Sequence, residues 1–239
     1  MGLFDGIDLP ILRWLTGFVG RVPLFDHLVH ALSRYDSFKG VPIMALLWYA
    51  WFRATPGEAS EQRAARQNHL VAVLAGAIGT VLLSRLLQLV LHLHQRPILA
   101  GLGLAFPDFI DRSSVNPWNS FPSDHSMLFF ALATGLWQVE RRLGAIAYFW
   151  AAVMIDLPRL YLGLHYPSDI VVGAVLGTLC MIGFLRLPLR PVWQAVERWR
   201  MGHAAGFYAL AFLLTEQVAR LFDDIRRLGY AAFGHLPTE

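Results

Sequence analysis

Charged residues are scarce in this chain, and the scarcity excludes an ordinary water-soluble domain. Only 15% of the 239 residues are charged and 56% are hydrophobic, whereas a soluble domain carries about a quarter charged residues. The mean hydropathy of +0.46 points in the same direction. The composition therefore indicates a protein that lies in a membrane.

Cysteine and lysine are each present once. Cys180 is the only cysteine, so no intrachain disulfide can form, and the apolar sequence around it indicates a packing role. Lys39 is the only lysine, so arginine carries nearly all of the positive charge. The net charge of +3 is small, and we infer no nucleic-acid function from it. The first residues lack the basic start and apolar core that are typical of a secretory signal.

Apolar residues are grouped in runs, and a helix needs a run of about 17–25 residues to cross a bilayer. The longest run covers residues 70–93, and weaker or shorter ones cover residues 41–52, 126–138, 144–155, 170–187 and 206–222. The last run contains Glu216 and Arg220, so it is predicted either to cross the bilayer or to lie at its surface. The runs predict an all-α fold, a polytopic membrane helical bundle with about six transmembrane helices.

The chain has no internal repeat and no low-complexity tract, so we expect a single domain over residues 1–239. Residues 1–35 are predicted to form an amphipathic N-terminal segment, residues 70–187 the core that bears the motifs, and residues 203–239 a C-terminal helix. The sequence leaves open whether the two terminal segments cross the bilayer, and it does not determine the oligomeric state.

The arginines between the apolar runs predict the orientation of the chain, because cytoplasmic loops carry an excess of positive charge. One side of the predicted bundle has the larger set: Arg53, Arg63, Arg66, Arg141, Arg142, Arg186, Arg190, Arg198 and Arg200. The other side has Arg96, Arg112 and Arg159. We therefore expect a multi-pass membrane protein whose first side lies in the cytoplasm and whose second side faces away from it. Residues 97–121 form a loop on that side, long enough to predict a lid.

Three short polar segments lie on this outer side. They are residues 95–97 (Gln-Arg-Pro), residues 121–125 (Phe-Pro-Ser-Asp-His) and residues 159–169, which include His165. Each segment lies at the end of an apolar run, so the topology is expected to bring all three together at one membrane surface.

The third segment has the groups needed for attack on phosphorus. Pro167 suits the first turn of a helix, which places His165 just outside that helix and Asp169 within reach of one ring nitrogen. A carboxylate there fixes the imidazole tautomer and stabilises a developing positive charge. The other ring nitrogen could act as a nucleophile, and the planar guanidinium of Arg159 could bind phosphate oxygens. Asp169 could also serve only as a helix cap.

The second segment opens a helix whose unpaired N–H groups and dipole attract an anion. His125 lies in its first turn and could donate a proton to a leaving oxygen. Ser123 could bind phosphate or only cap the helix, and Asp124 lies between the two. Arg96, held by the stiff Pro97, would add a second cation. The set suits phosphoryl transfer, in which positioning and charge supply most of the rate, and no carboxylate cluster predicts a metal or other cofactor.

Together the motifs resemble the type 2 phosphatidate phosphatase superfamily, whose signature reads K-x6-R-P, then P-S-G-H, then S-R-x5-H-x3-D. The resemblance covers roughly residues 70–187 and implies a six-helix membrane fold. It also implies that His165 is the nucleophile, Asp169 its partner and His125 the general acid. The groups at the substrate phosphate would be Arg96, Ser123, Asp124 and Arg159.

Three positions depart from this signature. Leu89 stands in place of the lysine, Asp124 in place of the glycine, and Pro158 in place of the serine. The loss of a phosphate cation at Leu89 could cost orders of magnitude in rate. Residues 119–125, with Asp124 among them, look like the branch that acts on undecaprenyl diphosphate. That likeness favours a polyprenyl diphosphate as the substrate.

Arg85 and His92 are auxiliary candidates to replace the missing lysine. Arg85 precedes Arg96 by eleven residues, which places it about 16 Å deeper at 1.5 Å per residue. We therefore expect Arg85 to pair inside the bundle with Asp156 or Glu216. His92 is nearer and could donate to the phosphate.

The leading hypothesis is an enzyme that hydrolyses undecaprenyl diphosphate to the monophosphate through a phosphohistidine intermediate. Alternatives of the same class are a phosphatase for phosphatidate, phosphatidylglycerol phosphate or a lipid A phosphate, and a phosphotransferase. An alternative of another class is a carrier or binding protein for lipid phosphates, which Leu89 favours. The pair of His125 and His165 disfavours it, because binding alone needs no nucleophile opposite a proton donor. The expected partners are the lipid substrate and the bilayer.

Overall fold

The computed structural model describes residues 4–54, 56–91, 95–112, 115 and 119–223, and the regular elements within these ranges are all helical. The prediction of an all-α fold is thus confirmed. In chain order the elements are α1 (Asp5–Thr16), α2 (Pro23–Arg34), η1 (Asp36–Phe38), α3 (Gly40–Phe52), α4 (Ser60–Val90), α5 (Asp124–Val139), α6 (Arg141–Trp150), η3 (Ala151–Asp156), α7 (Leu157–Tyr161), α8 (Pro167–Leu185), α9 (Arg190–Gly202) and α10 (Ala204–Ala219).

Three helical stretches are long and apolar enough to cross a membrane: Ser60–Val90, Arg141–Tyr161 and Pro167–Leu185. The second of them is continuous through α6, the π-helical η3 and α7. The helices α3 and α10 are apolar but shorter. The structure therefore supports a polytopic membrane bundle, whereas the number of six spans stays a prediction.

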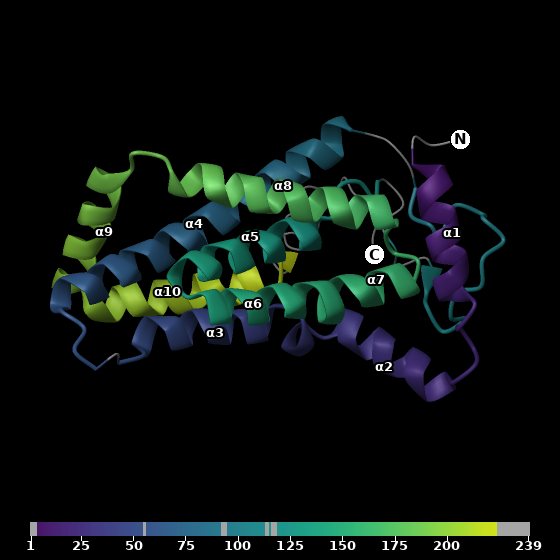
Figure 1. The fold of residues 1–239 in the computed structure, drawn as a ribbon, viewed down its shortest axis with the longest axis horizontal. Coiled ribbons are helices and arrows are strands. Elements are labelled where there is room, and N and C mark those ends of the chain that lie inside the picture. The colour runs from purple at the N-terminus through teal and green to yellow at the C-terminus, as the bar shows by residue number, and fades with distance from the viewer. Residues whose placement is uncertain (1–3, 55, 92–94, 113–114, 116–118, 224–239) are drawn as a thin grey trace.

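The long helices run side by side along the long axis of the molecule, while α9 lies across one end and α1 across the other (Figure 1). At the centre of the bundle, α5 contacts α4, α6 and α8. Side chains that α5 contributes to the core are fully or almost fully buried: Met127, Leu128, Phe129, Leu132 and Leu136. The position of α5 matters for function because the second polar segment forms its first turn.

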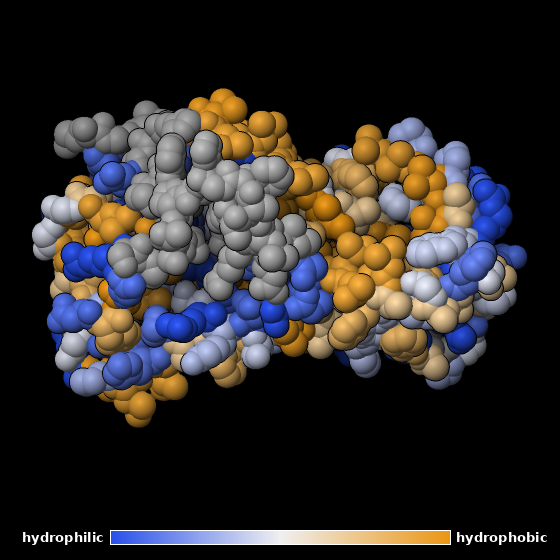
Figure 2. All heavy atoms as spheres, turned by 180° about the vertical axis from the view of Figure 1, so that it is seen from behind, coloured by the Kyte–Doolittle hydropathy of each residue, from blue (hydrophilic) through white to orange (hydrophobic). Residues whose placement is uncertain are grey.

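The outer surface of the bundle is rich in exposed apolar side chains. On α4, α8 and α10 the side chains more than half exposed include Leu82, Leu86, Leu89, Val171, Val175, Leu179, Phe212 and Leu213. In Figure 2, hydrophobic side chains gather across the middle of the face shown, and hydrophilic ones are more frequent toward the two ends. Soluble monomers rarely expose apolar patches of this extent, so the surface suits a lipid environment.

Two glycines allow α8 to approach α5 closely. A Cβ atom added at Gly177 would lie 2.1 Å from the carbonyl oxygen of Met127. One added at Gly173 would lie 2.7 Å from the carbonyl oxygen of Ser123. Small residues at helix contacts let membrane helices pack backbone against backbone. This contact fixes the first turn of α5 relative to α8.

The N-terminal segment, predicted to be amphipathic, forms α1 and α2 at one end of the bundle (Figure 1). On α1, the carboxylate of Asp8 is 2% exposed. It accepts hydrogen bonds from the backbone N–H of Ser168 at 2.9 Å and from its hydroxyl at 2.6 Å. The first turn of α8 is therefore held by α1. In the predicted C-terminal segment, α10 ends at Ala219, and residues 224–239 lie outside the described residues.

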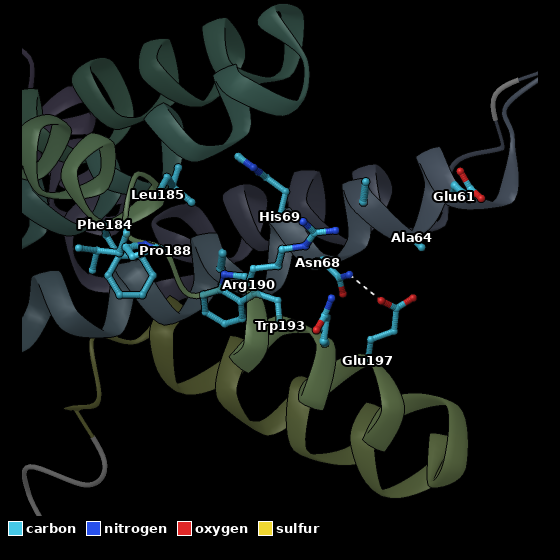
Figure 3. Close-up of a pocket in the computed structure, with 14 residues that line it drawn as sticks. Glu61, Ala64, Asn68, His69, Phe184, Leu185, Pro188, Arg190, Trp193 and Glu197 are labelled. Atoms are coloured by element: carbon cyan, nitrogen blue, oxygen red, sulfur yellow. Dashed lines mark hydrogen bonds between the residues drawn. The ribbon is translucent and has the colours of Figure 1, made fainter.

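A hollow of about 650 Å³ lies at the other end of the bundle, between α4, the end of α8 and α9 (Figure 3). Its lining includes Asn68, whose side-chain amide donates to Glu197 at 2.8 Å (Figure 3). Seventeen residues of α4 separate Asn68 from Arg85, which is about 26 Å at 1.5 Å per residue. The hollow is therefore remote from the three polar segments.

The close contact of α5 and α8 predicts the effect of a single methyl group. Gly177→Ala should destabilise the bundle by about 1–3 kcal/mol, because an overpacked site must move its neighbours apart. The measurement is the melting temperature of the purified protein in detergent.

Gly183→Ala, on the same helix, is the matched control, since a Cβ atom there meets nothing within 4 Å. It should leave the melting temperature unchanged or raise it, because alanine is the better helix former. Equal melting temperatures of the two variants would contradict the proposed role of the contact.

Candidate active site

The three predicted polar segments meet at the end of the bundle where α5 and α8 begin. The first is joined to the third because Arg96 donates from Nη1 to the carbonyl oxygen of Leu164 at 2.8 Å. The second is joined to the third because the backbone N–H of Ser123 donates to the carbonyl oxygen of Asp169 at 3.1 Å. The convergence that the topology predicted is therefore present in the structure.

His165 lies at the centre of this arrangement and is 1% exposed. Its Nδ1 atom is 3.0 Å from the carbonyl oxygen of Ser120 and 3.4 Å from Oδ2 of Asp169. Both neighbours are acceptors, so Nδ1 carries the proton in the neutral ring. The Nε2 atom is 3.3 Å from Nη1 of Arg96. The lone pair of Nε2 therefore lies beside the cationic side chain of Arg96, and the role of His165 as a nucleophile stays a prediction.

Three effects act on the pKa of His165. Burial lowers the pKa, because the charged imidazolium is poorly solvated inside the protein. The hydrogen bond to Asp169 raises it and the charge of Arg96 lowers it, and the net shift is downward. The imidazole is therefore neutral at neutral pH.

Asp169 makes two contacts in the first turn of α8. It is fully buried, and its Oδ2 atom accepts from the backbone N–H of Tyr166 at 2.9 Å and lies 3.4 Å from Nδ1 of His165. The predicted helix cap is therefore present, and the same contact fixes the carboxylate beside the histidine. The role of Asp169 as the partner of a nucleophile stays a prediction.

Ser123 caps α5, as one of the two interpretations predicted. Its hydroxyl accepts from the backbone N–H of Ser126 at 3.4 Å, and the residue is fully buried. The role of Ser123 as a phosphate ligand stays a prediction. The peptide bond between Phe121 and Pro122, just before this turn, is cis.

His125 is linked through Nδ1 to Oδ1 of Asp124 at 2.8 Å, and the exposed fraction of its side chain is 21%. Asp124 is 5% exposed, and its Oδ2 atom is 2.8 Å from Nη2 of Arg85. The carboxylate therefore bridges a helix cation and the predicted general acid. The Nε2 atom is then the ring nitrogen of His125 that can face a substrate.

The predicted partners of Arg85 were wrong. Asp156 accepts instead from the hydroxyl of Ser126 at 2.9 Å, and Glu216 pairs with Arg220 at 2.7 Å. The prediction assumed that the helix continues to Arg96, whereas α4 ends at Val90. Two hydrogen bonds hold the end of α4 near the start of α5. Nε2 of Gln88 donates to the carbonyl oxygen of Pro122 at 2.9 Å, and Nδ2 of Asn119 donates to the carbonyl oxygen of Gln88 at 3.0 Å.

Arg159 is 4% exposed and donates from Nη1 to the carbonyl oxygen of Ile155 at 3.1 Å. Sequence reasoning missed that Lys39 shares its surroundings. Burial lowers the pKa of Lys39, the positive charge of Arg159 lowers it further, and the ion pair with Asp36 at 2.7 Å opposes both. The one feature of the sequence that could have drawn attention to this residue is that it is the single lysine of the chain. The segment before α3 thus adds a cation to the electrostatic surroundings of Arg159.

The remaining predicted positions fall around this site. Leu89, at the place of the signature lysine, is 70% exposed on the outside of α4. His92 lies outside the described residues. In the loop of residues 97–121, Phe106 packs against Gly163, where an added Cβ atom would lie 2.3 Å from its ring. The described part of this loop therefore rests on the segment that carries His165, and a lid function stays a prediction.

Metal ligands do not gather at this site. Within the residues that the structure describes, no group of three or more His, Cys, Asp and Glu side chains is arranged to hold a metal ion. The polar groups described at this site are two histidines, each beside a carboxylate, and the arginines around them.

Known proteins with similar sequences or folds give the family. YbjG of Escherichia coli K12, to which an undecaprenyl-diphosphatase activity is ascribed, is 27% identical over 212 residues, which are 89% of this chain and 96% of YbjG. The bacitracin transport permease protein BcrC of Bacillus licheniformis is 38% identical over 63 residues, 26% of this chain and 30% of that protein.

A solved structure has a similar fold. The crystal structure of LpxE from Aquifex aeolicus aligns with a TM-score of 0.58 at 23% identity, covering 78% of this chain and all of that one. The sequence pattern of the PAP2 superfamily matches residues 70–193, slightly more than half of the chain and all three polar segments. The chain therefore belongs to the PAP2 superfamily.

Proposed function

We propose that this protein is a membrane phosphatase that hydrolyses a polyprenyl diphosphate, undecaprenyl diphosphate in particular, to the monophosphate. The observation that carries the proposal is the environment of His165. Its Nδ1 atom faces the acceptors of Ser120 and Asp169, and its Nε2 atom faces Arg96. A ring held in this tautomer presents a lone pair to a bound phosphate, which simple binding would not require.

In the first step, Nε2 of His165 attacks the terminal phosphorus and a P–N bond forms. The bond between that phosphorus and the bridging oxygen breaks, and His125 donates a proton to the departing oxygen. Arg96 and Arg159 would bind the non-bridging oxygens, together with the N–H groups at the start of α5. The lipid monophosphate leaves with the proton from His125.

In the second step, a water molecule attacks the phosphorus of the phosphohistidine. His125, now neutral, accepts a proton from that water, and the P–N bond breaks. Inorganic phosphate leaves, His165 regains its lone pair, and His125 regains its proton. Both steps use only groups of the chain and water.

The match to YbjG over nearly its whole length supports the diphosphate substrate. Asp124, which sets this chain apart from the general signature, supports the same branch of the family. A 74-residue stretch that is 28% identical to the lipid A 1-diphosphate synthase of Escherichia coli K12 keeps an enzyme acting on a lipid A phosphate as the second candidate. A carrier without catalysis is disfavoured, because burying His165 between acceptors and a cation serves no binding role.

The proposed location is the bacterial cytoplasmic membrane, with the site on the periplasmic side. The arginines of α9, which lies at the end opposite the site, support this orientation (Figure 1). Arg53 and Glu140 form an ion pair between the end of α3 and the residue before α6. These groups would lie at the cytoplasmic surface.

A phosphate-release assay in detergent tests the proposal. Undecaprenyl diphosphate and phosphatidate are offered in parallel, with EDTA present, to the wild-type protein and to His165→Ala. We expect release from the diphosphate to be faster, to resist EDTA, and to fall about 10³-fold or more without the nucleophile.

No release from either lipid, although the folded protein binds both, would favour the carrier. Release that survives in His165→Ala would contradict the phosphohistidine. A phosphoenzyme that forms in the wild type but turns over only when a lipid or sugar acceptor is added would identify a transferase.

The pKa of His165 predicts the pH dependence. Since burial lowers the pKa of His165 below its ordinary value of 6.5 and attack needs the neutral ring, the acid limb of kcat/KM should lie below pH 6.5. A basic limb should report the loss of the proton that His125 donates. Asp169 raises this pKa, so Asp169→Asn should move the acid limb to still lower pH. The same variant should lower the maximal rate by about 10²–10⁴-fold, because the ring loses its orientation.

Both proteins are compared with one substrate, so that titration of the substrate phosphate contributes equally to the two profiles. An acid limb that moves to higher pH in Asp169→Asn would contradict this account of the histidine.

A further inference from the structure

Arg85, Asp124 and His125 form a connected row that reaches from α4 to the first turn of α5. Nη2 of Arg85 is 2.8 Å from Oδ2 of Asp124, and Oδ1 of Asp124 is 2.8 Å from Nδ1 of His125. The two carboxylate oxygens therefore serve two different neighbours.

We propose that Arg85 and Asp124 are positioning residues that give the leaving-group acid, His125, a carboxylate partner of its own. The inference rests on the proposed function, in which His125 delivers the proton. The site would then contain two histidines, one acting as the nucleophile and one as the general acid, and each would have an aspartate at its Nδ1 atom. Asp169 serves the nucleophile, and Asp124 serves the acid.

The chemistry of the acid explains why such a partner helps. A general acid must hold its proton on the nitrogen that faces the leaving oxygen. Donation from Nδ1 to Asp124 fixes the ring and leaves Nε2–H as the transferable proton. It also stabilises the imidazolium that must exist before transfer.

The carboxylate can do this only if it is ionised and held in place. Asp124 is 5% exposed, and a buried carboxylate without a countercharge is strongly disfavoured. The guanidinium of Arg85 supplies that countercharge. The pair has no net charge, so it adds no repulsion toward the phosphate that Arg96 and Arg159 attract.

Further contacts make the row rigid. Oδ1 of Asp124 also accepts from the backbone N–H of His125 at 2.8 Å. Gln88 accepts from Nη1 of Arg85 at 3.3 Å and donates to the carbonyl oxygen of Pro122 at 2.9 Å. The polar face of α4 therefore holds both the arginine and the turn that carries the carboxylate.

The experiment joins kinetics with a spectroscopic signature. Asp124→Asn, Arg85→Gln and the double variant are compared with the wild type, using the lipid phosphate that the wild type cleaves fastest. We expect each single variant to lower kcat by about 10–100-fold, within the contribution of a general acid, and to leave KM nearly unchanged. The double variant should lose no more than the worse single variant, because the two residues act as one unit.

In ¹⁵N-histidine-labelled wild-type protein, the Nδ1 resonance assigned by loss in His125→Gln should report a proton hydrogen-bonded to a carboxylate. That signature should disappear in Asp124→Asn. Arg53→Gln, which removes an ion-paired arginine at the end of the bundle opposite the site, is the control and should change neither readout. Melting temperatures identify any single variant that has lost its fold. In that case the double variant, which leaves the net charge of the pair at zero, is compared with the wild type instead.

The outcomes separate the two proposals. Full kcat in Asp124→Asn, or a loss of kcat with an unchanged ¹⁵N signature of His125, would overturn the positioning role while the phosphatase proposal stands. Absence of any His165-dependent release in the wild type would overturn the phosphatase proposal. An equal loss in Arg53→Gln would mean that the effect is on stability alone, which also contradicts the inference.

Discussion

The backbone contact between α5 and α8 is the constraint on which the site depends. Gly173 and Gly177 bring the two helices to contact distance, and the N–H of Ser123 then reaches the carbonyl oxygen of Asp169. Both helices begin at this point, so two positive helix ends face the same space. Wherever α5 and α8 are placed in this way, an anion is attracted before any side chain acts. In the proposed mechanism the two histidines then act on that anion.

Two buried carboxylates are stabilised at this site because each one lies in the first turn of a helix and also contacts a histidine side chain. Asp169 caps α8 and faces His165, while Asp124 lies in the first turn of α5 and faces both Arg85 and His125. In an apolar bundle an unpaired charge would be costly. The same requirement that stabilises the fold therefore fixes the orientation of both rings. Stability and catalytic geometry are, at this site, consequences of the same contacts.

Much of this could be predicted from the sequence. The apolar runs predicted the helical bundle, and three polar segments at their ends predicted where Arg96, His125 and His165 would meet. The pairing of Arg85 could not be predicted, because it depends on where α4 ends, and helix ends are the least certain feature of a sequence pattern. The contact of Asp8 with Ser168 joins residues 160 positions apart, and nothing in the local pattern signals it. The local periodicity of the sequence predicts the buried face and the approximate ends of a helix. Contacts between residues of distant helices depend on how the helices pack.

The substitution at Leu89 is understandable in the same terms. A side chain there points outward and is 70% exposed, so a leucine meets the apolar surroundings of the bundle at no electrostatic cost. A cation of α4 lies one turn earlier, at Arg85, and it pairs with Asp124. A glycine in place of Asp124 would leave His125 without its carboxylate and Arg85 without its ion-pair partner. Of the two departures from the family signature, the aspartate is therefore the one that is linked to the cation of α4 by direct contact, whereas Leu89 faces outward.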